Sequence, residues 1–189
     1  MASASPRRSD LLAQAGIPFE VEVANFDEES LRHLPPLAQA RRAAAGKAET
    51  VAARHPTRWV LGCDTVVILD GQALGKPRDG VEASRMLKHL SGREHSVVTA
   101  LVLLGPSGAR GAGFGRSVVA FRQLSHEEIA DYVASGEPLD KAGAYAIQGE
   151  AGEFVALVSG RVDTVIGLPL HVASRLGRRL ACPAFDAPG

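Results

Sequence analysis

The residue that most needs a chemical explanation is Asp64, which lies in the middle of an apolar run. Residues 59–69 are apolar almost throughout, rich in β-branched side chains, and followed by the tight-turn pair Asp70-Gly71. This pattern predicts a strand that is buried on both faces. A carboxylate in such a strand needs a cation, a metal ion or a proton. The alternative is an ordinary aspartate that caps a loop or pairs with one arginine.

Two arginines near the start of the chain form the second chemical feature. Ser5 and Pro6 are suited to the N-cap and first position of a helix, which puts Arg7 and Arg8 in its first turn. Cations are disfavoured there by the helix dipole, whereas the free backbone N–H groups favour an anion. Together with Ser3, the arginines therefore indicate an anion site, with solvated arginines as the alternative.

Two lysines add to this basic set. Lys47 lies at the edge of the apolar face of a predicted helix that runs from Pro35-Pro36 to about Arg54. Lys76 lies in a stiff loop between Gly75 and Pro77, but the glycine register and Pro77 rule out a Walker phosphate loop. An ordinary surface lysine is the alternative at position 47.

Cations beside carboxylates are typical of a site for a magnesium-bound polyphosphate. The carboxylates are Asp64 and Glu28, with the neighbouring Glu29 as an alternative to Glu28. The six histidines are scattered and do not predict a zinc site, and no Gly-x-Ser-x-Gly motif suggests a covalent nucleophile. The residues alone therefore predict non-covalent phosphate chemistry.

The remaining elements predict an α/β fold in which helices flank a mixed central sheet. Beyond residues 59–69, strands are expected at 19–23, 97–104, 117–123 and 154–158, with a flexible Gly-rich hairpin tip at 105–115. Helices are expected at 6–16, 79–92, 125–136 and 168–177, the second and third with capping boxes. Residues 140–149 form an irregular, glycine-punctuated loop of the kind that often carries function.

Composition limits the classes of function. The 189 residues contain 21 basic and 21 acidic side chains, and this balance argues against a dedicated nucleic-acid binder. Cys63 and Cys182 form neither a disulfide framework nor a metal-binding spacing. No apolar signal core and no membrane-length run is present, so a cytoplasmic, soluble protein is expected, without a membrane partner.

Seven motifs, taken in order, resemble those of the Maf family of nucleoside triphosphate pyrophosphatases, once described as septum-formation inhibitors. They are Ser3-x-Ser5-Pro6-Arg7-Arg8, Gly62-Cys63-Asp64-Thr65-Val66-Val67, Gly75-Lys76-Pro77-Arg78-Asp79, Leu90-Ser91-Gly92 with Thr99-Ala100, Asp140-Lys141-Ala142-Gly143-Ala144-Tyr145, Ile147-Gln148-Gly149 and Val165-Ile166-Gly167-Leu168-Pro169. They span nearly the whole chain.

The resemblance implies one two-lobed domain over residues 1–180, folded around a cleft like the inosine triphosphate pyrophosphatases, with a loose tail at 181–189. It implies hydrolysis of a nucleoside triphosphate to the monophosphate and pyrophosphate, with a divalent cation, Mg²⁺ or alternatively Mn²⁺. It also implies a homodimer. A non-catalytic nucleotide-binding regulator of cell division is the main alternative.

Residue roles follow from the same resemblance. Asp64 matches the family's proton-accepting carboxylate, and Glu28 matches an acidic position at the metal, which Asp64 also contacts. The positions that match its substrate-contacting residues are Ser3, Arg7 or Arg8, Lys47 and Lys76.

Three further positions bear on which nucleobase the substrate carries. Members that resemble dTTP/UTP pyrophosphatases have the residues found here at Arg7, Thr65 and Gln148, whereas 7-methyl-GTP enzymes have Trp, Gln and Glu. A glutamine amide offers one donor and one acceptor, which suits the O4/N3–H edge of uracil or thymine. The expected substrates are therefore dTTP and UTP, with modified pyrimidine nucleotides as a further class and a 7-methyl-GTP-type activity as the alternative.

Overall fold

The computed structural model describes residues 1–186 and confirms the predicted α/β class. Five strands form one sheet in the order β2-β1-β3-β4-β5. The pairs β1–β2 and β4–β5 are antiparallel, and Ala2, outside the named strands, makes an isolated parallel bridge to Gly62 of β1. The strands are β1 (Val60–Leu69), β2 (Gln72–Leu74), β3 (Glu94–Leu104), β4 (Arg110–Phe121) and β5 (Val155–Ser159).

The chain divides into two compact units, and β1, β3 and β4 contribute residues to both. The first unit comprises residues 1–64, 99–115 and the chain from Gly167 onward, and the second comprises residues 65–98 and 116–166. The first contains α1 (Pro6–Gln14), α2 (Pro36–Ala52) and α6 (Leu170–Arg179). The second contains α3 (Gly80–Leu90), α4 (His126–Ala134) and α5 (Val162–Ile166).

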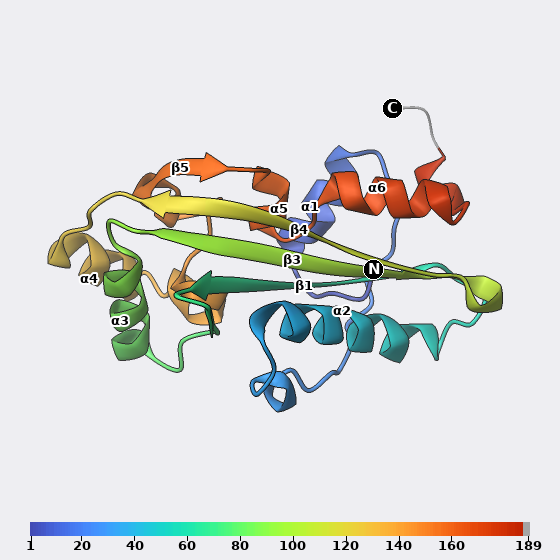
Figure 1. The fold of residues 1–189 in the computed structure, drawn as a ribbon, viewed down its shortest axis with the longest axis horizontal. Coiled ribbons are helices and arrows are strands. Elements are labelled where there is room, and N and C mark those ends of the chain that lie inside the picture. Colours follow the sequence, from blue (N-terminus) through green and yellow to red (C-terminus); the bar gives the residue numbers. More distant parts are fainter. Residues whose placement is uncertain (187–189) are drawn as a thin grey trace. The chain divides into compact units, whose positions relative to one another are not determined.

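In the first unit, α2 packs closely on the first half of β1 (Figure 1). Gly62 lets this happen, because a Cβ atom there would lie 2.8 Å from the Cβ of Ala48 and still closer to the carbonyl oxygen of Ala44. Ala44 and Ala48 are fully buried. Small residues on both elements therefore bring the two backbones together, and this contact sets the position of every side chain on that face of α2.

The glycine-rich segment that the sequence predicts as a flexible hairpin tip is mostly strand, so that expectation is wrong. β4 begins at Arg110, and only residues 105–109 form the turn. A Cβ atom on Gly113 would lie 2.5 Å from Val172 of α6, and one on Gly111 would lie 2.9 Å from Leu180. The glycines allow α6 to approach the strand closely, which is a known use of glycine in strands.

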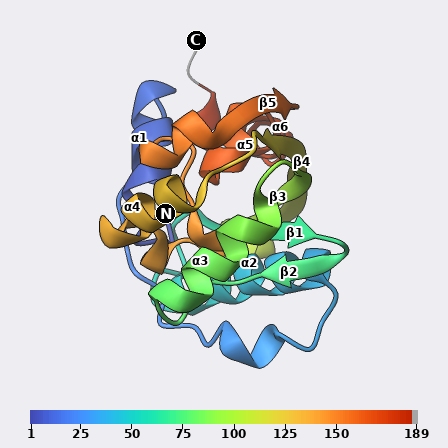
Figure 2. The same cartoon turned by 90° about the vertical axis from the view of Figure 1, so that its left-hand side faces the viewer.

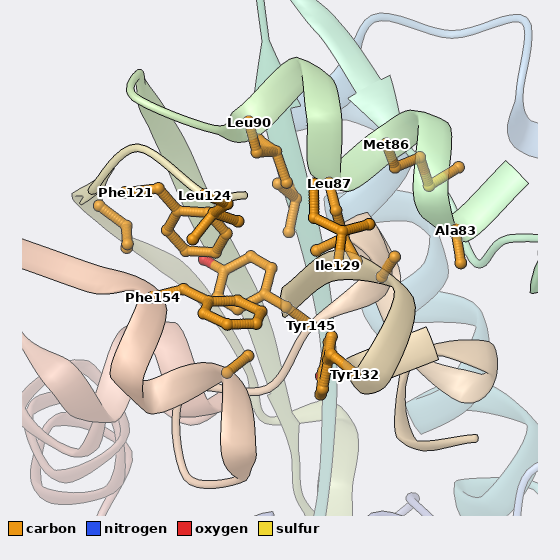
Figure 3. Close-up of a cluster of buried hydrophobic side chains, with 14 of the residues drawn as sticks. Ala83, Met86, Leu87, Leu90, Phe121, Leu124, Ile129, Tyr132, Tyr145 and Phe154 are labelled. Atoms are coloured by element: carbon orange, nitrogen blue, oxygen red, sulfur yellow. The ribbon is translucent and has the colours of Figure 1, made fainter. Parts of the chain in front are cut away.

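In the second unit, α3 and α4 lie against each other (Figure 2). Side chains of both helices meet aromatic rings of the sheet and of the following loops in one buried cluster (Figure 3). Within it, Phe121 makes edge-to-face contacts to Tyr145 and Phe154 at centroid distances of 4.9 and 6.1 Å. This cluster holds the segments that carry the site residues of the second unit.

The predicted helix starts are largely confirmed. Ser125 and Glu128 form a complete capping box on α4, and the Asp79 side chain accepts a hydrogen bond from the Glu82 N–H on α3. Pro6 opens α1 as predicted, although Ser5 makes no side-chain capping bond.

Two expectations about irregular segments are wrong. Residues 19–23 form no strand, because their bonds go to the start of the chain (Glu22 N–H to the Met1 carbonyl, 3.0 Å) and Val21 and Val23 are exposed. Residues 181–186 are not loose, since Pro183–Phe185 form a turn and buried Phe185 packs on Gly177. The rest of the predicted tail, 187–189, lies outside the described residues.

None of the helices within residues 1–186 is long and apolar enough to cross a membrane.

The contact between α2 and β1 leads to a stability prediction. We expect Gly62→Ala to lower the free energy of unfolding by about 3 kcal/mol, because the added methyl meets backbone that cannot move aside. The matched control is Gly71→Ala, where a Cβ meets nothing within 4 Å and only the positive φ costs about 1 kcal/mol. Urea unfolding measures both. A loss at position 62 no larger than that at position 71 would show that α2 and β1 can separate.

Candidate active site

The candidate site is built around Asp64, whose side chain is only 11% exposed. β1 is buried along nearly its whole length, as the apolar sequence predicts, so Asp64 is held among apolar neighbours by the strand itself. Burial alone strongly favours the neutral form of a carboxyl group. The group therefore needs a partner, and the structure supplies one from α2.

That partner is Lys47, whose Nζ lies 2.7 Å from Asp64 Oδ1. Lys47 follows Ala44 by three positions and precedes Ala48 by one, so the close packing of these alanines on Gly62 directs the lysine toward β1. Its side chain is 12% exposed. Lys47 is therefore an internal ion-pair partner and not an ordinary surface lysine.

Glu28 is the second carboxylate at Lys47, with its Oε1 2.9 Å from Nζ. Glu29 instead pairs with Arg32 at 2.5 Å on the surface. Of the two glutamates, Glu28 is therefore the one that contacts Lys47, and its role at a metal ion stays a prediction. One ammonium group lies between two carboxylates that are 36 residues apart in the chain.

These neighbours decide the protonation of the site. Burial raises the pKa of Asp64 above its ordinary value, the Lys47 ammonium partly offsets this rise, and the negative charge of Glu28 adds to it. The net direction is upward. A carboxylate with a raised pKa is a better proton acceptor than a free aspartate, which is the property a general base requires.

The two arginines of α1 have different environments. Arg8 is buried: its Nε donates to the Gly167 carbonyl at 2.8 Å, and its Nη1 donates at 3.0 Å to both Ser3 Oγ and the carbonyl of Cys63. It thus anchors the backbone directly before Asp64. Ser3 is also buried and held in place by Arg8.

Arg7, in contrast, is half-buried, and its side chain makes no hydrogen bond or ion pair within residues 1–186. It lies in the first turn of α1, where the N-cap residue Ser5 uses no side-chain bond to satisfy the backbone N–H groups. Of the pair, Arg7 is the arginine available to an incoming anion.

The three other predicted residues belong to the second unit. Thr65 directly follows Asp64 on β1 and is half-buried, while Lys76 and Gln148 are exposed. Neither of these two exposed side chains bonds to any part of the chain that the structure describes. The structure thus brings together two groups in the first unit, Glu28–Lys47–Asp64 and Ser3–Arg8.

Glu137, which no sequence motif marks, fixes the loop that carries Gln148. Its Oε2 accepts from the Glu150 N–H at 3.2 Å, and its Oε1 accepts from the Tyr132 hydroxyl at 3.0 Å. Gly149 permits this, because a Cβ atom there would collide with the Glu137 carboxylate. The only sequence signal is therefore the glycine, and it does not reveal its partner.

The two carboxylates at Lys47 fit a divalent cation. Within residues 1–186, no group of three or more His, Cys, Asp and Glu side chains could hold a metal ion alone. Mg²⁺, however, is commonly held by one or two carboxylates with substrate phosphates and water completing its shell. Glu28 and Asp64, which already converge on one cationic group, provide such a pair.

Comparison with known proteins places the chain in a family. The family model described as Maf-like protein matches residues 1–180, and the chain belongs to this family. It is 48% identical to the dTTP/UTP pyrophosphatase of Moorella thermoacetica over 171 residues, which cover 90% of this chain and 88% of that protein.

Two further relatives carry the same name. The Myxococcus xanthus protein is 49% identical over 183 residues (97% of this chain, 92% of that one), and the Symbiobacterium thermophilum protein is 45% identical over 189 residues (98% and 95%). Among solved structures, a nucleoside-triphosphatase / dITP/XTP pyrophosphatase from Mycobacterium abscessus aligns with a TM-score of 0.46 at 17% identity, over 96% of this chain and 95% of that one.

The raised pKa of Asp64 predicts a pH-dependent contribution to stability. Because the folded state holds this proton more tightly than the unfolded state, the contribution is full below about pH 3.9 and is lost as the pH rises through the raised folded pKa. We therefore expect the free energy of unfolding of the wild-type protein to fall, relative to that of Asp64→Asn, across this interval in urea titrations.

The exposed Asp131→Asn serves as the control and should keep a nearly constant difference from the wild type. If the free energy of unfolding of the wild type instead rises relative to that of Asp64→Asn with increasing pH, the Lys47 ion pair would have a larger effect on the pKa of Asp64 than burial has.

Proposed function

We propose that this protein is a magnesium-dependent hydrolase that converts dTTP and UTP to the monophosphate and pyrophosphate. The observation that carries the proposal is the buried Asp64 carboxylate, held against Lys47 and Glu28 in a chain of the Maf family. The names of the relatives support the reaction and its substrates. Modified pyrimidine triphosphates are a further substrate class within the same proposal.

In this reaction Asp64 accepts the proton of a water molecule as the water oxygen attacks the α-phosphorus in line. The bond between the α-phosphorus and the bridging oxygen breaks, and pyrophosphate leaves with its electron pair. Burial raises the pKa of the Asp64 carboxyl in the metal-free protein, and its carboxylate oxygens are the acceptors for this proton. A divalent cation held by Asp64 and Glu28 would supply charge neutralisation on the phosphate oxygens.

Cationic side chains bind the phosphate groups in this proposal. Arg7 offers a guanidinium at the start of α1 that has no partner among residues 1–186, and backbone N–H groups there also favour an anion. Lys47 and Lys76 are the further phosphate contacts in the proposal. Arg8 acts differently: it holds Ser3 and the backbone before Asp64 and so positions the carboxylate.

Recognition of the nucleobase is assigned to Arg7, Thr65 and Gln148. The exposed Gln148 amide can donate to and accept from the O4/N3–H edge of a pyrimidine. Glu137 supports this assignment, because it fixes the backbone at Glu150, two residues beyond Gln148.

The proposal also includes a cytoplasmic location, where nucleoside triphosphates are found, and assembly as a homodimer, which the family resemblance supports. It includes no nucleic-acid or membrane partner, and the equal numbers of acidic and basic residues support the absence of a nucleic-acid partner.

The reaction itself is tested by pyrophosphate release. We expect the wild-type protein to release pyrophosphate from dTTP and UTP only with Mg²⁺ or Mn²⁺ present. Asp64→Asn should lower kcat by about 10²–10⁴-fold, the usual contribution of a general base, while Asp131→Asn should leave it unchanged. Nucleotide binding without any pyrophosphate release would instead identify a non-catalytic regulator, and near wild-type turnover by Asp64→Asn would exclude Asp64 as the base.

The base-reading role is tested by a triple variant, Arg7→Trp with Thr65→Gln and Gln148→Glu. A glutamate at position 148 offers only acceptors, which suit the donors of a guanine edge and repel the O4 of a pyrimidine. We expect kcat/KM to favour 7-methyl-GTP over dTTP in this variant, the reverse of the wild type. A variant that still prefers dTTP would refute the assignment of these three residues.

A further inference from the structure

Lys47 occupies an unusual position, because its ammonium group lies where the two carboxylates would share a metal ion. The Nζ atom is 2.7 Å from Asp64 and 2.9 Å from Glu28, and both contacts are of hydrogen-bond length. Lys47 and Asp64 are almost fully shielded from water, whereas the side chain of Glu28 is 50% exposed. Within residues 1–186, the Lys47 ammonium is therefore a cation that contacts both carboxylates at once.

The charges of this group disfavour a metal ion on its own. Two carboxylates and one ammonium sum to a single negative charge. A dication at the same carboxylates would either displace Lys47 or lie close to it, and in partly buried surroundings such a like-charge contact is costly. A nucleoside triphosphate changes the balance, since its phosphates bring several negative charges and new acceptors for the lysine.

We propose that Lys47 is a place-holder for the metal ion. Without nucleotide its ammonium fills the cation position between Glu28 and Asp64, and it moves to phosphate oxygens when the metal and the triphosphate enter together. The inference rests on the proposed function and deepens it. It makes Lys47 a positioning residue in the resting protein as well as a phosphate contact in the complex.

The side chains involved are suited to such an exchange. Lysine carries a compact charge on a flexible four-carbon stem, so its ammonium can change partners without moving α2. Glu28 adjoins the short turn Glu29–Leu31 and is half exposed, so a metal ion can reach it from solvent. Asp64, by contrast, is fixed on β1, and the Arg8 bond to the preceding carbonyl holds its backbone.

A permanent structural ion pair is the competing explanation of the same contacts. In that case Lys47 would serve only to neutralise Asp64, and its removal would leave the affinity for a free metal ion unchanged or lower. The place-holder role predicts instead that removing Lys47 raises the affinity for a free metal ion, because the cation position becomes vacant. The two explanations therefore differ in a binding measurement that requires no nucleotide and no turnover.

The experiment measures Mn²⁺ binding to nucleotide-free protein by electron paramagnetic resonance. We expect Lys47→Met to bind Mn²⁺ at least about tenfold more tightly than the wild type, which corresponds to about 1.4 kcal/mol. Lys88→Met, which removes an exposed lysine of α3 and changes the net charge equally, should bind as the wild type does. Equal or weaker Mn²⁺ binding by Lys47→Met would overturn the proposal.

Two further variants test whether a gain in Mn²⁺ affinity comes from the proposed position. Lys47→Gln keeps a donor toward Asp64 without a charge, so it provides the same test if Lys47→Met does not fold, with tighter binding again expected and equal or weaker binding again contradicting the proposal. Adding Glu28→Gln to the position-47 variant should abolish the gain, since one of the two ligands is lost. A gain that survives Glu28→Gln would place the metal elsewhere and overturn the proposal.

Failure of the place-holder and failure of the proposed function are distinguishable. Wild-type protein that releases no pyrophosphate from dTTP would refute the function, whatever the metal affinities are. Normal pyrophosphate release combined with unchanged Mn²⁺ binding in Lys47→Met would refute the place-holder alone.

Discussion

The structure of the site depends on one constraint, namely that a carboxylate buried in a central strand must meet a cation. Lys47 meets Asp64 at 2.7 Å from α2, which packs directly on β1, and this close packing depends on Gly62 and on the small side chains of Ala44 and Ala48. Glu28 joins the same ammonium group, and Arg8 fixes the backbone on the other side of Asp64. The residues that form the site are therefore inseparable from those that let the helix approach the strand.

Local signals in the sequence predicted most of the secondary structure. The apolar run became β1, Pro6 opened α1, and the Ser125 capping box is complete, because each of these patterns determines structure within a few residues. The wrong predictions of secondary structure arose where contacts with distant parts of the chain determine the local structure. The glycines of β4 are explained by α6, which approaches the strand from more than 50 residues away in sequence, and alternation at residues 19–23 had no neighbouring strand to pair with.

For the site, the sequence supplied the residue types and the family resemblance supplied their roles, but neither supplied the contacts. The helix-start pattern does not distinguish the environments of Arg7 and Arg8, although the Arg7 side chain has no partner within residues 1–186 and that of Arg8 donates to Ser3 and to the carbonyls of Cys63 and Gly167. The choice between Glu28 and Glu29 likewise depends on which side chain reaches Lys47. Such differences arise from side-chain direction and burial, which require the assembled fold.

In the proposed reaction Asp64 accepts the proton of a water molecule that attacks the α-phosphorus, and the oxygen atom of that water can be followed into the products. Hydrolysis of dTTP in water enriched in a heavy oxygen isotope, followed by mass spectrometry of both products, identifies the phosphorus that is attacked. Attack at the α-phosphorus places the label in the nucleoside monophosphate and leaves the pyrophosphate unlabelled. Label in the pyrophosphate, or the appearance of labelled orthophosphate, would contradict it.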